Sequence, residues 1–392
     1  MTGASPRAQA ALAPASARIV TGAGGAGKVP GVLGRRRFVL GAAAVAAGGR
    51  ASRHLIVYRE PGRFGGWPAN HGIWSWGNEI LCGFSGAYFE KRPPERHQYD
   101  SRKPEVPPLA GSTDGGESWT VERPASLVPP EQGGPAPQPL TRPMDFHAPG
   151  FALTLRFTDV HTGPSRPFYS TDRVRNRRGP FLFPMFGFSG VAARTAYRVS
   201  SPKEALVFLT VSKSNGREGR PVAVQTRDGG RTWSLLAAIG PEPPGFAIMP
   251  SSLRLPGGAL LTAVRVKKDP ENWIELFRSR DNGRSWTSER RVADTEAFSG
   301  NPPHLVRLRG GRLCLSYGYR SRPYSIRARI SPDDGRSWLP GILPRDDGAP
   351  WDIAYVRTAV RPDGRVVTLY HFNDAPHNER FLAATIWEAP RA

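Results

Sequence analysis

Apolar and polar residues alternate in short runs along this chain, and turns containing glycine separate the runs. Residues 253–261, 306–314 and 360–367 each form an alternating run, a glycine turn and a second run. A period of two residues around such a turn is typical of a β-hairpin. Helical periodicity is nearly absent, so the pattern predicts an all-β protein. The last glycines of the three turns, Gly258, Gly311 and Gly364, recur regularly and indicate a repeat of roughly 50 residues.

A second motif recurs with the same period. Residues 112–119, 226–233, 279–286 and 331–338 share Ser or Thr, Asp, Gly and Trp at fixed positions. The wide gap after the first copy predicts another copy in its middle, where Ser170 and Asp172 keep the first half of the motif. Asp-Gly and Asn-Gly pairs favour a tight turn whose amides the Asp side chain can bond. We therefore interpret the motif as a structural turn and not as a catalytic group.

The repeats predict the architecture. Five such turns and one further unit of the same length indicate a six-bladed β-propeller over residues 51–392, with about four short strands in each blade. A propeller has to protect its edge strands. We therefore expect the strand at residues 54–59 to close the last blade by pairing with the strand at residues 381–388.

Residues 1–50 differ from the rest of the chain. They are rich in Ala and Gly, and Arg35, Arg36 and Arg37 precede a short apolar stretch at residues 38–47. That stretch is too short to span a bilayer. Twin arginines before such a stretch are typical of a bacterial twin-arginine export signal. We expect an exported protein, periplasmic or extracellular, without stable membrane insertion; a disordered Ala-rich tail is the alternative.

The chain is strongly basic, with a formal net charge of +21, and only 7 of its 54 basic residues are Lys. Part of this excess reflects composition bias, and the rest indicates an acidic partner. The chain has no basic tract with interleaved aromatics, no helix-turn-helix and no zinc pattern, so we do not expect a nucleic-acid partner. Arginine favours bidentate capture of carboxylates. We expect a monomer without cofactor or metal, and buried free thiols at Cys82 and Cys314.

The four complete motifs resemble the Asp boxes of the sialidase superfamily, whose fold is a six-bladed propeller. The resemblance extends over residues 53–390. It implies three arginines that hold a substrate carboxylate, a Tyr nucleophile activated by a Glu, and an Asp that acts as acid and base. An uncharged nucleophile can approach an anomeric carbon that bears a carboxylate, which explains the use of Tyr.

Two segments resemble those that carry the reacting groups in this family. In residues 354–370, a Tyr precedes a strand, an Asp-Gly turn and a Leu-Tyr strand, so the resemblance implies Tyr355 as the nucleophile. Asp100 lies shortly before the first Asp box and takes the place of the acid/base, with His97 in the same polar loop. A packed, barrel-lining Tyr and a solvated loop Asp are the alternatives.

The segment at residues 248–265 resembles the run that ends in the second family arginine, which implies Arg265. Met249 stands where the activating Glu belongs, and without that base Tyr355 is expected to keep a pKa near 10. The third arginine remains open among Arg320, Arg322 and Arg327, and we favour Arg320 and Arg327 as residues of the pocket.

The first arginine is ambiguous. Arg59 fits one alignment, and the Gly-rich stretch at residues 62–72 fits another. Glycine allows a ligand to approach the backbone closely. We interpret this stretch as a pocket loop with Arg63, Asn70 and His71 as candidate contacts, although an ordinary loop between blades explains it equally well.

Three functions follow from these residues. The first is an exported, sialidase-like glycoside hydrolase that acts on a glycan bearing sialic or uronic acid. The second is a uronate polysaccharide lyase, in which arginines neutralise the carboxylate while His71, His97 or Tyr355 removes a proton. The third is a propeller that binds acidic glycans without chemistry. The fold alone does not separate them.

Overall fold

The computed structural model describes residues 52–93, 95–296, 299–349, 351–374 and 379–390. The predicted export segment, residues 1–50, lies outside this part of the chain. Within the described residues, the helices are short 3-10 turns: η1 (Pro68–Asn70), η2 (Ala125–Leu127) and η3 (Pro130–Gln132). None of the described helices is long and apolar enough to cross a membrane.

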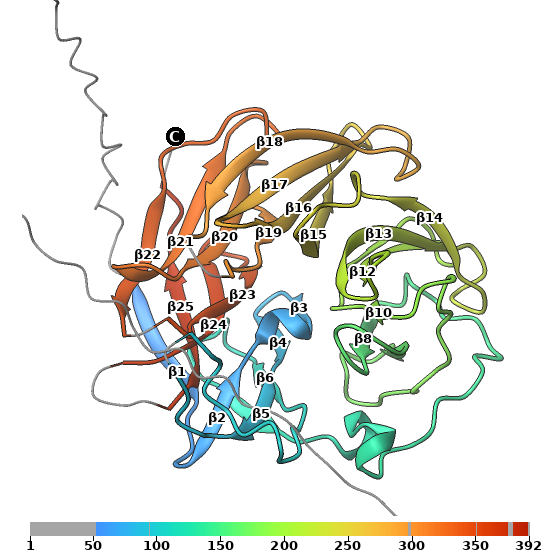
Figure 1. Cartoon of the computed structure of the whole chain (residues 1–392), viewed down its shortest axis with the longest axis horizontal. Coiled ribbons are helices and arrows are strands. Elements are labelled where there is room, and N and C mark those ends of the chain that lie inside the picture. The colour runs from blue at the N-terminus through green and yellow to red at the C-terminus, as the bar shows by residue number, and fades with distance from the viewer. Residues whose placement is uncertain (1–51, 94, 297–298, 350, 375–378, 391–392) are drawn as a thin grey trace, which may run out of the picture. The chain divides into compact units, whose positions relative to one another are not determined.

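The strands form sheets that follow one another around a ring (Figure 1), and we number these blades 1 to 6 in chain order. Blade 1 contains β3 (Ile73–Trp76), β4 (Glu79–Gly83), β6 (Leu109–Ser112) and β7 (Thr120–Glu122). Blade 2 contains β8 (Ala152–Phe157) and β9 (Ser165–Ser170). Blade 3 contains β10 (Val191–Ala192), β11 (Tyr197–Val199), β12 (Ala205–Ser212), β13 (Glu218–Thr226) and β14 (Ser234–Ala238).

The second half of the ring is more regular. Blade 4 contains β15 (Phe246–Arg254), β16 (Leu260–Lys268), β17 (Glu271–Ser279) and β18 (Thr287–Asp294). Blade 5 contains β19 (His304–Arg307), β20 (Leu313–Tyr319), β21 (Tyr324–Ser331) and β22 (Ile342–Gly348). Blade 6 contains β23 (Ala354–Val360), β24 (Val366–Phe372), β25 (Phe381–Trp387) and β1 (Arg53–Tyr58). The prediction of an all-β, six-bladed propeller is confirmed.

Blade 2 is shorter than the repeat predicts, because its sheet has two strands in the described residues. Residues 171–190, which follow β9, contain two prolines and several phenylalanines. Proline cannot donate a ladder hydrogen bond, so it disfavours further strands here. Phe183 from this segment packs instead in the apolar core that blades 2 and 3 share, together with Leu155 and Val207.

The ring closes through its two ends. Strand β1 pairs antiparallel with β25, with Arg53 opposite Ile386 and Tyr58 opposite Leu382. The predicted closure of the last blade is therefore confirmed. A separate two-stranded sheet joins β2 (Arg63–Gly66) to β5 (Ser85–Tyr88).

The Asp-box turns are formed by local hydrogen bonds. In the first copy, the Ser112 hydroxyl donates to Asp114 over 2.8 Å and accepts the Gly116 amide at 2.8 Å. The Asp114 carboxylate also accepts the Ser118 amide at 3.0 Å. The Trp119 indole folds back and donates to the Gly116 carbonyl at 2.9 Å. The structural interpretation of the motif is supported, because the carboxylate is saturated within its own turn.

The incomplete fifth copy keeps the same hydrogen bonds with different side chains. The Ser170 hydroxyl donates to Asp172 over 2.6 Å and accepts the Val174 amide at 3.0 Å. Val174 takes the glycine position with φ of 67°. The Asn176 side chain donates to Asp172 over 2.6 Å, where the other copies use a hydroxyl. The fifth copy that the spacing predicts is therefore present.

The core lies between the blades, where their sheet faces pack on each other. Strands β12, β24 and β25 are buried along their whole length. Their sequences are therefore mostly apolar and do not alternate between apolar and polar residues. Cys82 and Cys314 are buried free thiols, as the sequence predicts.

Candidate functional site

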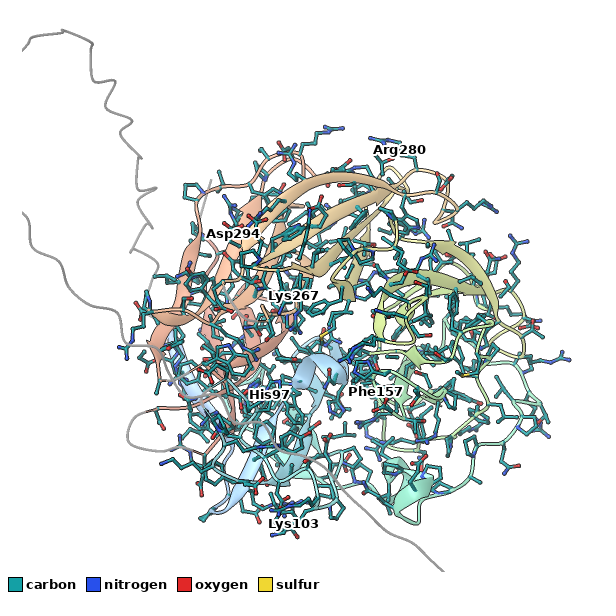
Figure 2. All side chains as sticks on the ribbon, viewed as in Figure 1. His97, Lys103, Phe157, Lys267, Arg280 and Asp294 are labelled. Carbon is teal, nitrogen blue, oxygen red and sulfur yellow. The ribbon has the colours of Figure 1, made fainter. Side chains whose placement is uncertain are left out.

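A cavity of about 600 Å³ opens among the loops of blades 1 to 4 and 6. Figure 2 shows His97 and Phe157, two residues of its lining, towards the middle of the ring, whereas Lys103 and Arg280 lie at the periphery. Five arginines and two carboxylates also line it: Arg156, Arg166, Arg194, Arg217, Arg265, Glu105 and Glu218. The excess of cationic side chains favours an anionic ligand.

Tyr355 and Arg265 meet in this cavity. Nη1 of Arg265 donates to the Tyr355 hydroxyl at 3.3 Å, and its Nε donates to the Ser299 carbonyl at 2.8 Å. Both side chains are nearly buried, with exposed fractions of 9% for Tyr355 and 4% for Arg265. The structure thus brings together two groups that the resemblance assigns to one site.

A strained backbone directs Tyr355 into the cavity. Its φ is 54°, and the pairing of β23 with β24 shifts register between Ala354 and Arg357. Met249 on β15 has φ of 57° at a similar register shift between Ile248 and Ser251. Bulges of this kind re-aim side chains beside functional sites. Tyr355 and Met249 thus occupy comparable places on two inner strands.

Arg320 lies behind Tyr355 and does not line the cavity. Its guanidinium carbon is 5.3 Å from the centre of the Tyr355 ring, and its Nε donates to the Ile353 carbonyl at 3.2 Å. The Arg320 side chain has no exposed surface. Arg320 therefore acts on the site through its charge, and the expectation that it lines the pocket is wrong.

The two guanidinium groups change the acidity of Tyr355. Burial acts to raise the pKa of its hydroxyl, but the charges of Arg265 and Arg320 outweigh burial, so the pKa lies below its ordinary value of 10.0. The expectation of a pKa near 10 is therefore wrong. Arginine charge, and not a neighbouring Glu, promotes ionisation here. Met249 contributes only its sulfur, which lies 3.8 Å from Nη1 of Arg265.

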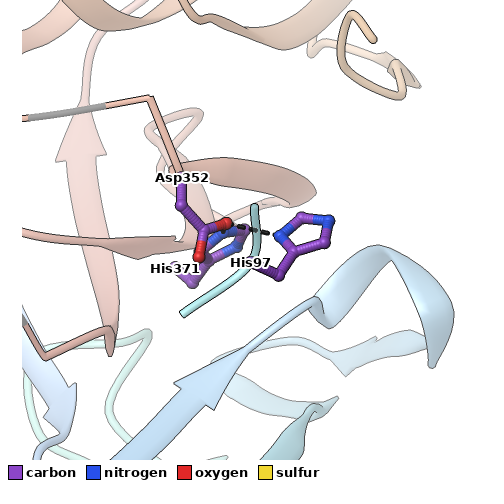
Figure 3. A group of neighbouring side chains, drawn as sticks. All are labelled: His97, Asp352 and His371. Carbon is purple, nitrogen blue, oxygen red and sulfur yellow. Dashed lines mark hydrogen bonds and ion pairs between the residues drawn. The ribbon is translucent and has the colours of Figure 1, made fainter. Parts of the chain in front are cut away.

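His97 is held by a buried carboxylate (Figure 3). Asp352 has no exposed surface, and its Oδ1 lies 2.6 Å from Nδ1 of His97 and 3.1 Å from Nε2 of His371. The carboxylate is a stronger partner for Nδ1 than the Trp67 indole N–H at 3.3 Å, so Nδ1 carries the proton. The Nε2 atom of His97 points away from Asp352 and keeps its lone pair.

Burial lowers the pKa of His97 from 6.5, although the carboxylate of Asp352 opposes this shift. The ring is therefore neutral at pH 7. Burial acts to raise the pKa of Asp352, but its contacts with His97 and His371 bring it well below the ordinary value. Asp352 stays ionised and positions a neutral imidazole that can accept a proton.

His97, Asp352 and His371 could also be considered as a metal site, since their ligand atoms lie within 4.8 Å of one another. The surroundings argue against a cation. Nε of Arg380 lies 3.4 Å from the Asp352 carboxylate, and Nη2 of Arg320 lies 4.0 Å from it. Two guanidinium charges already balance this carboxylate, so the cluster fits proton handling better than metal binding.

His71 and Asn70, both predicted as contacts, lie in the lining. Nε2 of His71 is 2.8 Å from the Ser85 hydroxyl, and Arg156 donates to Nδ1 of His71. Asn70 accepts a hydrogen bond from Nε of Arg194 at 3.1 Å. Burial and the neighbouring arginines hold the pKa of His71 well below 6.5, so this ring is neutral as well.

Three residues that we expected in the pocket lie outside the cavity lining. The Asp100 carboxylate accepts Nε of Arg102 at 2.8 Å, and this contact holds its pKa below the ordinary value. Arg63 stacks on the Tyr88 ring at 3.9 Å. Arg327 stacks on the Tyr319 ring at 3.4 Å and belongs to β21, the third strand from the axis. None of the three is among the described residues that line the cavity.

Several further polar groups lie near the cavity and could not be predicted from the sequence. Glu218 pairs with Arg194, whose Nη2 donates to Oε2 at 3.1 Å, and both side chains are 7% exposed. Burial raises the pKa of Glu105, while Ser85 and Arg156 oppose the shift. Burial also raises the pKa of Glu296 to about 7, against the charge of Arg320. No signal in the sequence marks these residues, because their partners are distant in the chain.

Comparison with known proteins identifies the fold. No family model matches the sequence, and no curated protein matches it. Among solved structures, a protein of unknown function from Dyadobacter fermentans is similar, with 22% identity over 86% of this chain and 99% of that one (TM-score 0.69).

Two enzymes of known activity are more distant. An alpha-L-arabinanase from Penicillium chrysogenum, solved with arabinobiose, shares 14% identity over 86% of this chain and 99% of its own (TM-score 0.58). A sialidase from Streptococcus pneumoniae shares 13% over 85% of this chain and 70% of its own (TM-score 0.56). The chain is thus an all-β propeller of the sialidase-like type, and glycoside hydrolases are among its structural neighbours.

Proposed function

We propose that this protein is a glycoside hydrolase that cleaves an anionic glycan, with Tyr355 as the nucleophile. The observation that carries the proposal is the Tyr355 hydroxyl in an arginine-rich cavity, 3.3 Å from Arg265 and with its pKa lowered by two guanidinium charges. An activated phenolic oxygen can form a covalent glycosyl intermediate. Arg265 also offers planar N–H donors suited to a substrate carboxylate.

The first step transfers the glycosyl group to the enzyme. The Tyr355 proton passes to Nε2 of His97, the neutral ring that Asp352 holds. The Tyr355 oxygen bonds to the anomeric carbon while the glycosidic C–O bond breaks. The leaving oxygen takes a proton from an acid, for which Glu105 is the candidate because it lines the cavity and burial raises its pKa. Glu105 replaces Asp100 in this role.

The second step reverses these bonds with water as the acceptor. Water gives a proton to the Glu105 carboxylate, and its oxygen bonds to the anomeric carbon. The bond between the sugar and Tyr355 breaks, and the phenolic oxygen recovers its proton from His97. The net change is the addition of one water across the glycosidic bond.

A uronate lyase is the second candidate, and the pairing of His97 with Asp352 favours it. A lyase needs a base, an acid and a cation beside the carboxylate, and it needs no Glu at the place of Met249. His97, Tyr355 and Arg265 supply those three functions in one cavity.

Product analysis distinguishes these functions. The purified protein is incubated with a panel of glycans that bear sialic or uronic acid, and the products are weighed by mass spectrometry. A hydrolase yields products whose summed mass exceeds that of the substrate by one water. A lyase yields an unsaturated sugar, and the summed mass of its products equals that of the substrate. Tyr355→Phe should abolish product, and Tyr319→Phe is the matched control because Tyr319 packs under Arg327 outside the lining. Absence of product from every acidic glycan contradicts both enzymatic proposals.

We also propose that the protein is exported through the twin-arginine route, since Arg35, Arg36 and Arg37 precede a short apolar stretch. Replacement of the three arginines by Lys should retain the protein inside a bacterial host. Equal export of the wild-type and Lys variants contradicts this proposal.

A further inference from the structure

A second cavity of about 570 Å³ lies along the inner strands of the ring. Its lining includes the later residues of β15 and β23, such as Leu253 and Thr358, whereas the first cavity contains Met249 and Tyr355 from the starts of the same strands. The two cavities therefore occupy successive levels along the inner strands.

Arg357 lies between the two levels. Arg357 lines the second cavity. Its Nη2 donates to the carbonyls of Ala69 at 2.6 Å, His71 at 3.2 Å and Arg194 at 2.7 Å. His71 and Arg194 line the first cavity. These bonds occupy Nη2, whereas Nε of Arg357 has no partner among the described residues. The two cavities share no lining residue, so the second is a separate compartment.

The charge in this compartment has one sign. Arg198, Arg254, Arg307 and Arg357 line it beside the neutral ring of His304, and no Asp or Glu is among its described lining residues. Arg307 reaches Asp334 over 3.2 Å, and Arg254 reaches the Asn282 side chain over 2.7 Å. Arg198 and Arg357, by contrast, make no ion pair with any residue that the structure describes. Two guanidinium charges are therefore left uncompensated.

Hydrogen-bond donors in the lining are also left over. Nε of Arg357 has no partner among the described residues, and this side chain is 4% exposed. Nδ1 of His304 accepts the Thr358 amide at 3.0 Å, so its Nε2 carries the proton. Buried donors of this kind cost free energy unless an acceptor reaches them.

We propose that the second cavity binds a small oxyanion, held by Arg198 and Arg357 with the N–H group of His304. An oxyanion supplies several acceptor atoms and negative charge together, which is what these groups lack. The electrostatics agree: burial lowers the pKa of Arg198 and of Arg357 to about 10, and neighbouring arginines add to the shift. An anion relieves this repulsion. The site is independent of the glycan site.

Binding is tested with inorganic sulfate and phosphate at constant ionic strength, with chloride as the balancing anion. Isothermal titration and thermal melting should show saturable binding and stabilisation of the full chain. Arg198→Gln should weaken binding about tenfold or more, because it removes a charged donor. Arg309→Gln removes the same charge from an exposed position and should bind as the wild type does.

Arg265→Gln separates the two cavities, because Arg265 lines the first one alone. Sulfate binding that survives Arg265→Gln and fails in Arg198→Gln supports the proposal. No saturable binding, or binding that Arg198→Gln leaves unchanged, overturns it. If Arg198→Gln does not fold, crystals of the wild-type protein soaked in selenate decide: an anomalous peak beside Arg198 supports the site, and an empty cavity refutes it.

Discussion

In the Asp-box turns each carboxylate is saturated by its own neighbours in the chain. Asp281 accepts the Ser285 amide at 2.9 Å and the Ser285 hydroxyl at 2.5 Å, four residues away. Behind the cavity lining, Asp352 binds His97, which lies 255 residues away, and that ring keeps one nitrogen free. A carboxylate whose partners are all local stabilises a turn. A carboxylate that binds one nitrogen of a histidine and leaves the other free can position that histidine as a base.

The difference between these regions predicts that stability and activity respond to different substitutions. Loss of an Asp-box group should lower the free energy of unfolding and leave the chemistry of folded molecules unchanged. Loss of a cavity group should change the chemistry and leave the free energy of unfolding nearly unchanged. Four predictions test this separation, from the largest expected effect to the smallest.

Tyr355→Phe should lower kcat by about a thousandfold or more, because it removes the proposed nucleophile and keeps the ring that packs beside His97. The melting temperature should change little, since the variant loses one hydrogen bond with Arg265. Product formation and thermal melting measured together check this. If the variant keeps the wild-type kcat, Tyr355 is not the nucleophile.

Asp228→Ala should lower the free energy of unfolding by about 1–3 kcal/mol, because the Thr232 amide and the Thr226 and Thr232 hydroxyls lose their acceptor. The activity per folded molecule should stay the same. Urea unfolding and kcat at low temperature provide the two measurements. Lost activity with unchanged stability means that the Asp box has a direct functional role.

Arg265→Lys should weaken binding of an acidic substrate about tenfold, although it keeps the charge. A Lys cannot bond the Ser299 carbonyl and Tyr355 at once through a planar group. The pKa of Tyr355 should stay lowered, because Arg320 remains and the charge is retained. Isothermal titration with the acidic reaction product measures the affinity. The pH dependence of tyrosine absorbance measures the pKa of Tyr355. Unchanged affinity excludes Arg265 from the substrate site.

The smallest effect concerns the fifth turn. Hydrogen bonds from Ser170 and Asn176 lower the pKa of Asp172 from 3.8 to about 2. A lowered carboxyl pKa contributes stability that is present above pH 3.8 and is lost as the pH falls through 2. Asp172→Asn should therefore flatten the loss of stability between pH 4 and pH 2, as measured by urea midpoints. Parallel curves for both proteins contradict the assigned shift.

The same contrast explains what the sequence could predict. The turns and the repeat depend on contacts within one unit or on regular spacing, and they were predicted correctly. The closing strand joins the two ends of the chain, and it could be predicted because a propeller has to protect its edge strands. The meeting of Tyr355 with Arg265 followed from resemblance to a known segment. Asp100 was expected in the pocket, but its carboxylate binds Arg102, two residues on, and is not among the described lining residues.

The remaining groups of the cavity could not be predicted, because their partners are remote in sequence. Arg194 meets Asn70 across 124 residues, and Arg357 meets Ala69 across 288. Neither pairing leaves a local pattern. The lowered pKa of Tyr355 was missed for the same reason, since it depends on how two distant arginines pack around one ring.

The central claim is that Tyr355 forms the covalent bond to the sugar. The direct measurement uses a fluorinated glycosyl substrate, whose enzyme-bound intermediate breaks down slowly, followed by mass spectrometry of the digested protein. We predict one glycosyl group on the peptide that contains Tyr355, and none on the Tyr355→Phe variant. A label on another residue such as Glu105, or an unsaturated product without any label, would contradict the account.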